Sequence, residues 1–279
     1  MASHRLASPS IKDRFKNWAY SATLSAGFNV KRKLSDSRII GLLGRLHPVT
    51  TSFPLLRLGA IGDGGYLVPD DLNGIVACFS PGVDDIATFE KDLLARGIPC
   101  FLADASVEGA PFADPNLHFE KKFLGVVNDE TFSTLDSWVD RAHPPAGDLI
   151  MQMDIEGNEW PVLLNVSEDT LRRFRIIVIE LHNLPHCFDP VAFQLFDSVF
   201  DRVGQIFNIV HAHPNNAFPH FRYNDIEIPY FLELTLLRKD RAAATGFVTK
   251  LPHPMDSPNV PDLVDVRLPA VLQGGPLNC

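Results

Sequence analysis

Asp148-Leu-Ile-Met-Gln-Met-Asp-Ile-Glu-Gly-Asn-Glu-Trp-Pro161 is the stretch that decides the fold. Its apolar run from Leu149 to Ile155 predicts a buried strand, and the glycine that follows predicts a turn into a helix. A second stretch, Arg175-Ile-Ile-Val-Ile-Glu-Leu-His182, has the same form. Ligands of open α/β sheets sit outside the carboxyl ends of the strands. The polar residues there are therefore candidates for a site, the alternative being ordinary helix-capping and solvated groups: Asp154, Glu156, Glu180 and His182.

Strands and helices alternate from residue 74 onward. The apolar runs and turn signals predict strands at 74–79, 99–103, 117–123, 149–155, 175–181, 205–211 and 230–238. Helices are predicted between them, at 86–96, 134–142, 159–166 and 191–203. This alternation predicts an α/β fold with a mainly parallel sheet and helices on both of its faces.

The segments on either side of this pattern differ from it. Residues 1–53 predict a helical extension with helices at 11–24 and 37–46, and residues 54–247 form the main domain. Within that domain, 55–59 and 66–68 predict a hairpin joined by a tight Asp-Gly turn. Residues 248–279 carry six prolines and little periodicity, which predicts a surface or mobile tail.

Charge is unevenly distributed along the chain. The net charge is −9, but residues 1–50 hold nine Lys or Arg and two Asp, so residues 51–279 carry −16. An acidic body argues against a nucleic-acid partner. The basic N-terminal segment fits either a solvated helical arm or a contact with an anionic lipid surface or phosphate-rich ligand.

Targeting signals are missing from the sequence. No apolar run approaches the roughly 20 residues that span a bilayer, and the first residues lack the apolar core of a signal peptide. The four cysteines show no CxxC spacing. We therefore expect a reduced, cytoplasmic protein without a transmembrane segment, and homo-oligomerisation stays open.

The first predicted strand, turn and helix have the form of a nucleotide-side pocket. Gly82 lets a ligand approach closely, and a helix beginning near Asp84 would offer free backbone N–H groups. Asp104, at the end of the second strand, is placed to accept the hydroxyls of a ribose. Carboxylates at Asp84 and Asp85 disfavour a pyrophosphate, so the cationic S-adenosylmethionine fits better than NAD or FAD. The same pattern also occurs in α/β proteins without such a ligand.

Five short motifs resemble those of the FkbM-type S-adenosylmethionine-dependent methyltransferases over about residues 55–238. They are Gly62-Asp-Gly-Gly-Tyr-Leu-Val68, Phe79-Ser-Pro-Gly-Val-Asp-Asp85 with Phe89-Glu90, Met153-Asp-Ile-Glu-Gly-Asn-Glu159, Ile179-Glu-Leu-His182 and Ile228-Pro-Tyr-Phe-Leu-Glu-Leu-Thr235. The resemblance implies a Rossmann-like class I methyltransferase fold, with seven strands and one antiparallel strand near the end. It also implies methyl transfer to a hydroxyl of a sugar or secondary metabolite.

The cofactor residues follow from this resemblance and from the strand-end rule. The first turn departs from the Asp-x-Gly-x-x-x-Gly loop of many members, since it reads Ser80-Pro-Gly-Val-Asp-Asp85. We expect the following residues to bind S-adenosylmethionine: Asp63, Gly64, Ser80, Gly82, Asp104, Ala105 and Asp154.

Two routes for removing the acceptor's proton remain open. In one, His182 is the general base and Glu180 or Asp154 orients it. In the other, Asp154, Glu180 and His182 hold Mg²⁺ or another divalent metal, which lowers the pKa of an acceptor hydroxyl. Acceptor contacts are expected at the turn and at the later histidine cluster, although the latter also fits a plain strand-end turn: Glu156, His211, His213 and Asn216.

Two other functions stay compatible with the sequence. One is a metal-dependent hydrolase or lyase that uses the three strand-end groups together with His211 and His213. The other is a non-catalytic binding module that keeps the fold, with the basic N-terminal arm recruiting it to a surface or partner.

Overall fold

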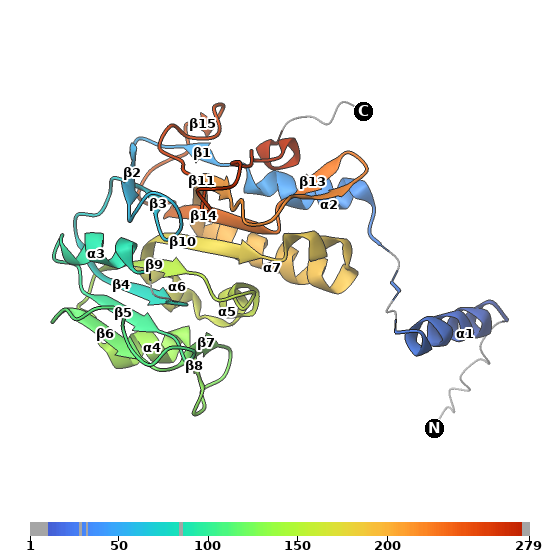
Figure 1. The fold of residues 1–279 in the computed structure, drawn as a ribbon, viewed down its shortest axis with the longest axis horizontal. Coiled ribbons are helices and arrows are strands. Elements are labelled where there is room, and N and C mark those ends of the chain that lie inside the picture. Colours follow the sequence, from blue (N-terminus) through green and yellow to red (C-terminus); the bar gives the residue numbers. More distant parts are fainter. Residues whose placement is uncertain (1–10, 28–29, 32, 84–85, 275–279) are drawn as a thin grey trace, which may run out of the picture.

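A seven-stranded sheet is the centre of the computed structural model, which describes residues 11–27, 30–31, 33–83 and 86–274 (Figure 1). Its strand order is β11-β14-β10-β9-β4-β5-β6, and β14 runs in the opposite direction to the other six strands. The prediction of a mainly parallel sheet with one antiparallel strand near the end is confirmed. The strands are β4 (Ile75–Pro81), β5 (Cys100–Ala103), β6 (Leu117–Glu120), β9 (Asp148–Met153), β10 (Phe174–His182), β11 (Phe207–Pro214) and β14 (Phe231–Arg238).

The central strands are buried on both faces, as crossover-connected parallel strands must be. In β10, Ile177 and Ile179 belong to one apolar core, while Ile176 and Val178 belong to a second core on the other face. This alternation follows from the two-residue period of a strand. All nine residues of β10 are buried, which explains why its sequence reads as an almost continuous apolar run.

Five helices cover the first face of the sheet. Helix α7 begins where the side chain of Asp189 accepts hydrogen bonds from the backbone N–H groups of Val191 and Ala192, with Pro190 at the first helical position. Thr134 and Ser167 cap two others in the same way. The helices of this layer are α2 (Asp36–Leu43), α4 (Leu135–Ala142), α5 (Glu159–Asn165), α6 (Glu168–Arg173) and α7 (Pro190–Ile206).

The second face is covered by helix α3 (Thr88–Leu94) and the hairpin of β2 (Leu55–Leu58) and β3 (Tyr66–Pro69). The predicted tight Asp-Gly turn is wrong, because residues 59–65 form a longer loop. The loop is held open by the guanidinium of Arg57, which donates to the carbonyls of Ala60 and Gly62. Helix α3 begins at Thr88 and not near Asp84, and Asp84 and Asp85 lie outside the described residues.

The C-terminal segment returns to the main domain. Strand β15 (Gly246–Phe247) pairs with β1 (Val49–Thr50), and Leu268, Val271 and Leu272 join the first apolar core. The expected surface or mobile tail therefore packs into the molecule as far as the described chain extends. The remaining short elements are β7 (Phe123–Gly125), β8 (Phe132–Thr134), β12 (Phe221–Tyr223), β13 (Ile226–Ile228), η1 (Gly44–Leu46), η2 (Leu184–Phe188) and η3 (Ala270–Gln273).

The N-terminal residues divide into two parts. Helix α2 buries Ile39, Leu42 and Leu43 in the core, so it belongs to the main body. Helix α1 (Ile11–Ser25) stands apart from that body, with Phe15 and Trp18 exposed (Figure 1). Within the described ranges, none of the helices has the length and apolar character needed to cross a membrane.

Candidate functional site

The carboxyl ends of β4, β5, β9 and β10 meet at one edge of the sheet, where a cleft of about 700 Å³ opens. A smaller cavity of about 70 Å³ adjoins it. Both are lined by Asp63, Gly82, Val83 and Asp154, so they form one continuous site. Asp104 lines the larger cavity and Gly64 the smaller one. The predicted cofactor residues at the strand ends are thus brought together.

Gly82 is required by the backbone of the neighbouring strand. It has a φ of +81°, and an added Cβ would lie 1.5 Å from the carbonyl oxygen of Asp154. The absent side chain therefore lets the turn after β4 cross close to the end of β9. Close approach to a ligand was the reason predicted from the sequence. The structure adds that Gly82 brings two walls of the cleft together.

Asp104 keeps one carboxylate oxygen for the cleft. Its Oδ1 accepts hydrogen bonds from the backbone N–H of Ser106 at 2.6 Å and from the Ser106 hydroxyl at 2.5 Å. These bonds fold the chain around Ala105 and hold the carboxylate at the end of β5. Its Oδ2 has no hydrogen-bond partner within the described chain. This arrangement suits an acceptor for sugar hydroxyls.

Ser80 lies beneath the cleft and lines neither cavity. Its fully buried hydroxyl hydrogen-bonds to Glu90 and, at 2.8 Å, to Oε1 of Gln152. Gln152 in turn donates to the hydroxyl of Tyr66 at 3.3 Å. Ser80 therefore supports other residues in place of contacting a ligand directly. Sequence reasoning assigned no role to Glu90, Gln152 or Tyr66, all of which line the smaller cavity.

His182 is surrounded by carboxylates although its side chain is only 5% exposed. Its Nδ1 lies 3.1 Å from Oε1 of Glu159, an ion-pair contact and not an aligned hydrogen bond. Its Nε2 lies 3.6 Å from Oδ1 of Asp154, 3.4 Å from Oε2 of Glu156 and 3.8 Å from Oε2 of Glu180. The predicted cluster of strand-end groups is therefore present in three dimensions.

Glu159 is the residue of this cluster that the sequence left without a role. Its side chain is fully buried, and its Oε1 accepts hydrogen bonds from the backbone N–H groups of Ile155 and Gly157. It thus shapes the turn after β9 and faces His182 at the same time. The sequence signal for Glu159 is its place in the first turn of α5, one residue before Trp160. Trp160 packs in the core and donates a hydrogen bond to the carbonyl of His182, which brings the start of α5 close to the histidine.

The electrostatics of the cluster favour proton uptake. Burial lowers the pKa of His182, but the carboxylates of Glu159, Asp154 and Glu156 outweigh it, and the net pKa is raised. Burial raises the pKa of Asp154 to about 6, against the opposing charge of His182. Burial and the charges of Asp154 and Glu233 hold the pKa of Glu180 well above its usual range. The site therefore concentrates negative charge that a cation would relieve.

The same groups fit a divalent metal in part. Asp154, Glu180 and His182 each offer a ligand atom within 4.8 Å of the others, and Oδ1 of Asp154 is buried without a hydrogen-bond partner. Carboxylate oxygens and an imidazole nitrogen form a donor set that several divalent ions accept. A metal at this place would replace the missing partner of Asp154.

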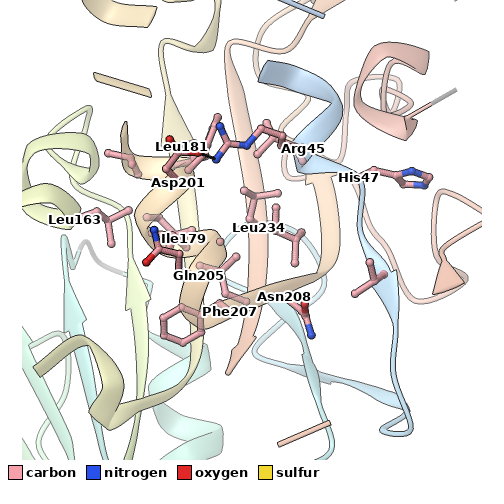
Figure 2. A pocket seen from close by; sticks show the side chains of 18 of the residues that line it. Arg45, His47, Leu163, Ile179, Leu181, Asp201, Gln205, Phe207, Asn208 and Leu234 are labelled. Atoms are coloured by element: carbon pink, nitrogen blue, oxygen red, sulfur yellow. Dashed lines mark hydrogen bonds and ion pairs between the residues drawn. The ribbon is translucent and has the colours of Figure 1, made fainter. Parts of the chain in front are cut away.

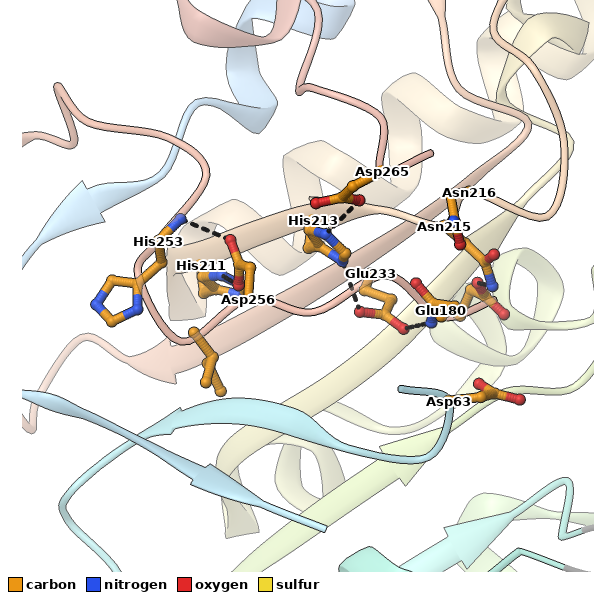
Figure 3. Close-up of polar contacts among 12 residues, drawn as sticks. Asp63, Glu180, His211, His213, Asn215, Asn216, Glu233, His253, Asp256 and Asp265 are labelled. Atoms are coloured by element: carbon orange, nitrogen blue, oxygen red, sulfur yellow. Dashed lines mark hydrogen bonds and ion pairs between the residues drawn. The ribbon is translucent and has the colours of Figure 1, made fainter. Parts of the chain in front are cut away.

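The predicted acceptor histidines face the C-terminal segment (Figure 3). His211 Nε2 lies 2.8 Å from Oδ1 of Asp256, and Nε2 of His213 lies 3.4 Å from Oδ1 of Asp265. His213 Nδ1 also lies 3.5 Å from Oε2 of Glu233. Glu233 of β14 is directly opposite Glu180 of β10 in the antiparallel pair of strands. The two histidines thus lie next to the acidic cluster, which is the set of carboxylates around His182. They also contact the C-terminal segment, for which the sequence predicts a tail.

Asn216 holds that segment in place. Its side-chain N–H groups donate to the carbonyls of Val260, Leu263 and Val264, and its Oδ1 accepts from the N–H of Val260. Both polar atoms of the Asn216 side chain are therefore bonded within the protein. In this conformation the side chain does not contact an acceptor directly. The neighbouring Asn215, unassigned from sequence, donates to Oε1 of Glu180 at 2.9 Å instead.

Glu156 is the one predicted acceptor residue that is open to solvent. Its side chain is 88% exposed at the rim of the larger cavity, and its backbone has a φ of +56°. A carboxylate on such a turn reaches both solvent and Nε2 of His182. Its position leaves it free to contact a second substrate.

One family model matches part of the chain. Residues 111–218 match the family model described as the methyltransferase FkbM domain. Among the curated proteins, none matches the chain. The solved structures that resemble it include one described as a fibrillarin/Nop5p complex, with 13% identity, 60% of this chain and 74% of that chain covered, and a TM-score of 0.36. The matched range contains Asp154, Glu180 and His182.

Proposed function

Because this chain carries the FkbM domain and is thus an S-adenosylmethionine-dependent methyltransferase, we propose that it methylates a hydroxyl of a small acceptor, such as a sugar or secondary metabolite. The observation that carries the proposal is the buried pair of Glu159 and His182. Neither lines the larger cavity, but Nε2 of His182 lies 3.6 Å from Asp154 and 3.4 Å from Glu156, which do line it. The FkbM domain favours this function over a metal-dependent hydrolase or lyase and over a non-catalytic module. A cytoplasmic location and homo-oligomerisation remain predictions.

The charge of the cleft supports the proposed place of the cofactor. Asp63, Asp104, Asp154 and Glu90 line the two cavities, and none of their lining residues in the described chain is Lys or Arg. Such a site attracts the sulfonium and ammonium groups of S-adenosylmethionine and repels a pyrophosphate. In the proposal, Asp104 accepts hydrogen bonds from the ribose hydroxyls, and the turn at Gly82 with Asp63 and Gly64 forms the opposite wall.

His182 is the proposed general base. Its Nε2 takes the proton of the acceptor hydroxyl while the oxygen attacks the methyl carbon. The carbon–sulfur bond breaks with its electron pair remaining on sulfur, which gives S-adenosylhomocysteine and the methyl ether. Glu159 faces Nδ1 and stabilises the imidazolium that forms, while Glu156 at the rim is placed to hold the acceptor.

A bound divalent metal is the second candidate, favoured by the unpartnered Oδ1 of Asp154. Asp154, Glu180 and His182 would hold it, and it would lower the pKa of an acceptor hydroxyl. In that case His182 would hold the metal through Nε2 and would not accept the proton. Mg²⁺ fits the two carboxylates better than the imidazole, which favours a softer divalent ion.

Chelation separates these two mechanisms. The purified protein would be dialysed against a chelator, and transfer of a tritiated methyl group from S-adenosylmethionine to a small-molecule extract would be measured. The base mechanism predicts unchanged transfer, whereas loss of transfer with recovery on adding Mg²⁺ or Mn²⁺ supports the metal. Calorimetry in which neither S-adenosylmethionine nor S-adenosylhomocysteine binds would refute the proposed cofactor site itself.

A further inference from the structure

A third cavity, of about 530 Å³, is lined by residues of the sheet and of helix α7 (Figure 2). Its lining includes Ile179 and Leu181 of β10, whereas Glu180 and His182 alternate with them and point to the opposite face. The cavity shares none of its described lining residues with the two cavities of the methyl-transfer site. It is therefore a separate site.

The inner wall of this cavity is apolar. The sheet provides one side through residues of the adjacent strands β10, β14 and β11, and helix α7 provides the other. No wall residue there offers a charged group to a ligand. The residues that form this wall are Ile179, Leu181, Leu234, Leu236, Val203 and Phe207. Such a surface accepts a hydrocarbon body, and its volume lies in the range of pockets for small molecules.

The mouth of the cavity is polar. The guanidinium of Arg45 is neutralised by Asp197 at 2.8 Å and by Asp201 at 2.6 Å. The exposed Lys239, another lining residue, donates to the carbonyl of Gly204 but has no acidic partner within the described chain. One positive charge of the described lining is therefore left uncompensated.

Two amide side chains that line the same cavity are free to bind a ligand. Those of Gln205 and Asn208 line the cavity and make no hydrogen bond in the part of the chain that the structure describes. An amide offers both a donor and an acceptor. Together with Lys239 they provide donors for one anionic group at the end of an apolar body.

We propose that this cavity binds a fatty-acid-type monocarboxylate, with its hydrocarbon chain between α7 and the sheet and its carboxylate at Lys239. The apolar wall excludes a polar or multiply charged ligand, because burying such a group without partners is costly. The single uncompensated ammonium selects an acid over a neutral alcohol of equal length. This inference stands apart from the methyl-transfer reaction, since the two sites have no described lining residue in common.

Fluorescence titration of the full chain with cis-parinaric acid, followed by displacement with dodecanoate, tests the site. We expect saturable binding of one molecule per chain at micromolar concentration. Ile209→Trp and Val203→Phe each fill part of the cavity and should weaken binding at least tenfold. Lys239→Ala should weaken it severalfold, while the matched control Lys121→Ala, whose ammonium pairs with Glu108, should not.

Dodecanol provides the test of the head group. We expect it to displace the probe less well than dodecanoate with the wild type, and equally well with Lys239→Ala. Two cavity-filling variants are used so that the test still stands if one of them misfolds. Thermal melting shows whether each variant is folded. Absence of saturable probe binding, or binding that a folded cavity-filling variant leaves unchanged, would overturn the proposal. Equal displacement of the wild-type complex by alcohol and acid would overturn the role of Lys239.

Discussion

Nδ1 of His182 lies 3.1 Å from Oε1 of Glu159, a carboxylate with no exposure to solvent. The same Oε1 accepts the backbone N–H groups of Ile155 and Gly157. One buried oxygen therefore fixes both the turn after β9 and the surroundings of the histidine at the end of β10. This couples the shape of the cleft to the protonation of its proposed base.

Glu159→Gln should lower the pKa of His182. The amide oxygen still accepts the two backbone hydrogen bonds of the turn, but the negative charge that favours the imidazolium is lost, and burial then dominates. Histidine-resolved NMR titration measures the shift. Glu168→Gln, on the exposed side of α6, is the control and should leave His182 unaffected. An unchanged pKa of His182 in a folded Glu159→Gln protein would show that Glu159 does not act on it.

Asp104→Ala should weaken the binding of S-adenosylhomocysteine by about tenfold to a hundredfold, because a charge-assisted hydrogen bond contributes roughly 1.5–3 kcal/mol. Isothermal titration calorimetry measures the dissociation constant. Asp104→Asn keeps the bonds to Ser106 and separates the loss of charge from the loss of the turn. Asp225→Ala is the control, because Asp225 is exposed. An equal loss of affinity in that variant would contradict the assignment of Asp104 to cofactor binding.

Gly82→Ala should destabilise the protein by about 2 kcal/mol or more. The added methyl group meets the carbonyl of Asp154, and the backbone at +81° is unfavourable for alanine. Chemical denaturation gives the free energy of unfolding. Gly109→Ala is a matched control, because its Cβ would have no neighbour within 4 Å. Equal stabilities of the two variants would contradict the close crossing of the turn and β9.

Asp148→Asn should destabilise the protein by about 1–3 kcal/mol at pH 7, because it removes a carboxylate from the buried guanidinium of Arg175 and from Arg238. Burial raises the pKa of Asp148, but the two arginines outweigh it, and the net pKa is lowered. A lowered pKa stabilises the fold above the ordinary carboxyl pKa, and this stability is lost as the pH falls below that value.

Unfolding free energies of the wild type and Asp148→Asn should therefore converge as the pH falls below about 4. Urea denaturation at several pH values measures this convergence. Asp240→Asn is the control, because Asp240 also pairs with Arg238 but is 62% exposed, and its effect should stay below about 0.5 kcal/mol. A constant difference between wild type and Asp148→Asn down to pH 2 would contradict the role of the ion pairs.

Much of the fold could be predicted from apolar runs alone. The runs around Leu149 and Ile177 are buried on both faces, so they identify β9 and β10 and place Asp154, Glu180 and His182 at strand ends. The loop between β2 and β3 could not be predicted in this way. Its length depends on bonds from Arg57 and on contacts with α3, which local turn propensities do not contain.

The packing of the C-terminal segment cannot be predicted from local sequence patterns. Its contacts join residues far apart in the chain, such as Asn259 with Glu233 and Asp256 with His211. A proline-rich stretch without periodicity gives no sign of such partners, so its sequence predicts a tail. Asn216 was predicted near the site for its residue type, but its hydrogen bonds to Val260 depend on this returning segment.

The most direct test of the account compares cofactor binding with methyl transfer in His182→Ala. S-adenosylhomocysteine affinity would be measured by calorimetry, and transfer of a tritiated methyl group from S-adenosylmethionine would be measured with a small-molecule extract. The account predicts an affinity within about threefold of the wild type and a rate about 10²–10⁴ times lower, the usual contribution of a general base. Methyl transfer by His182→Ala at the wild-type rate would contradict it.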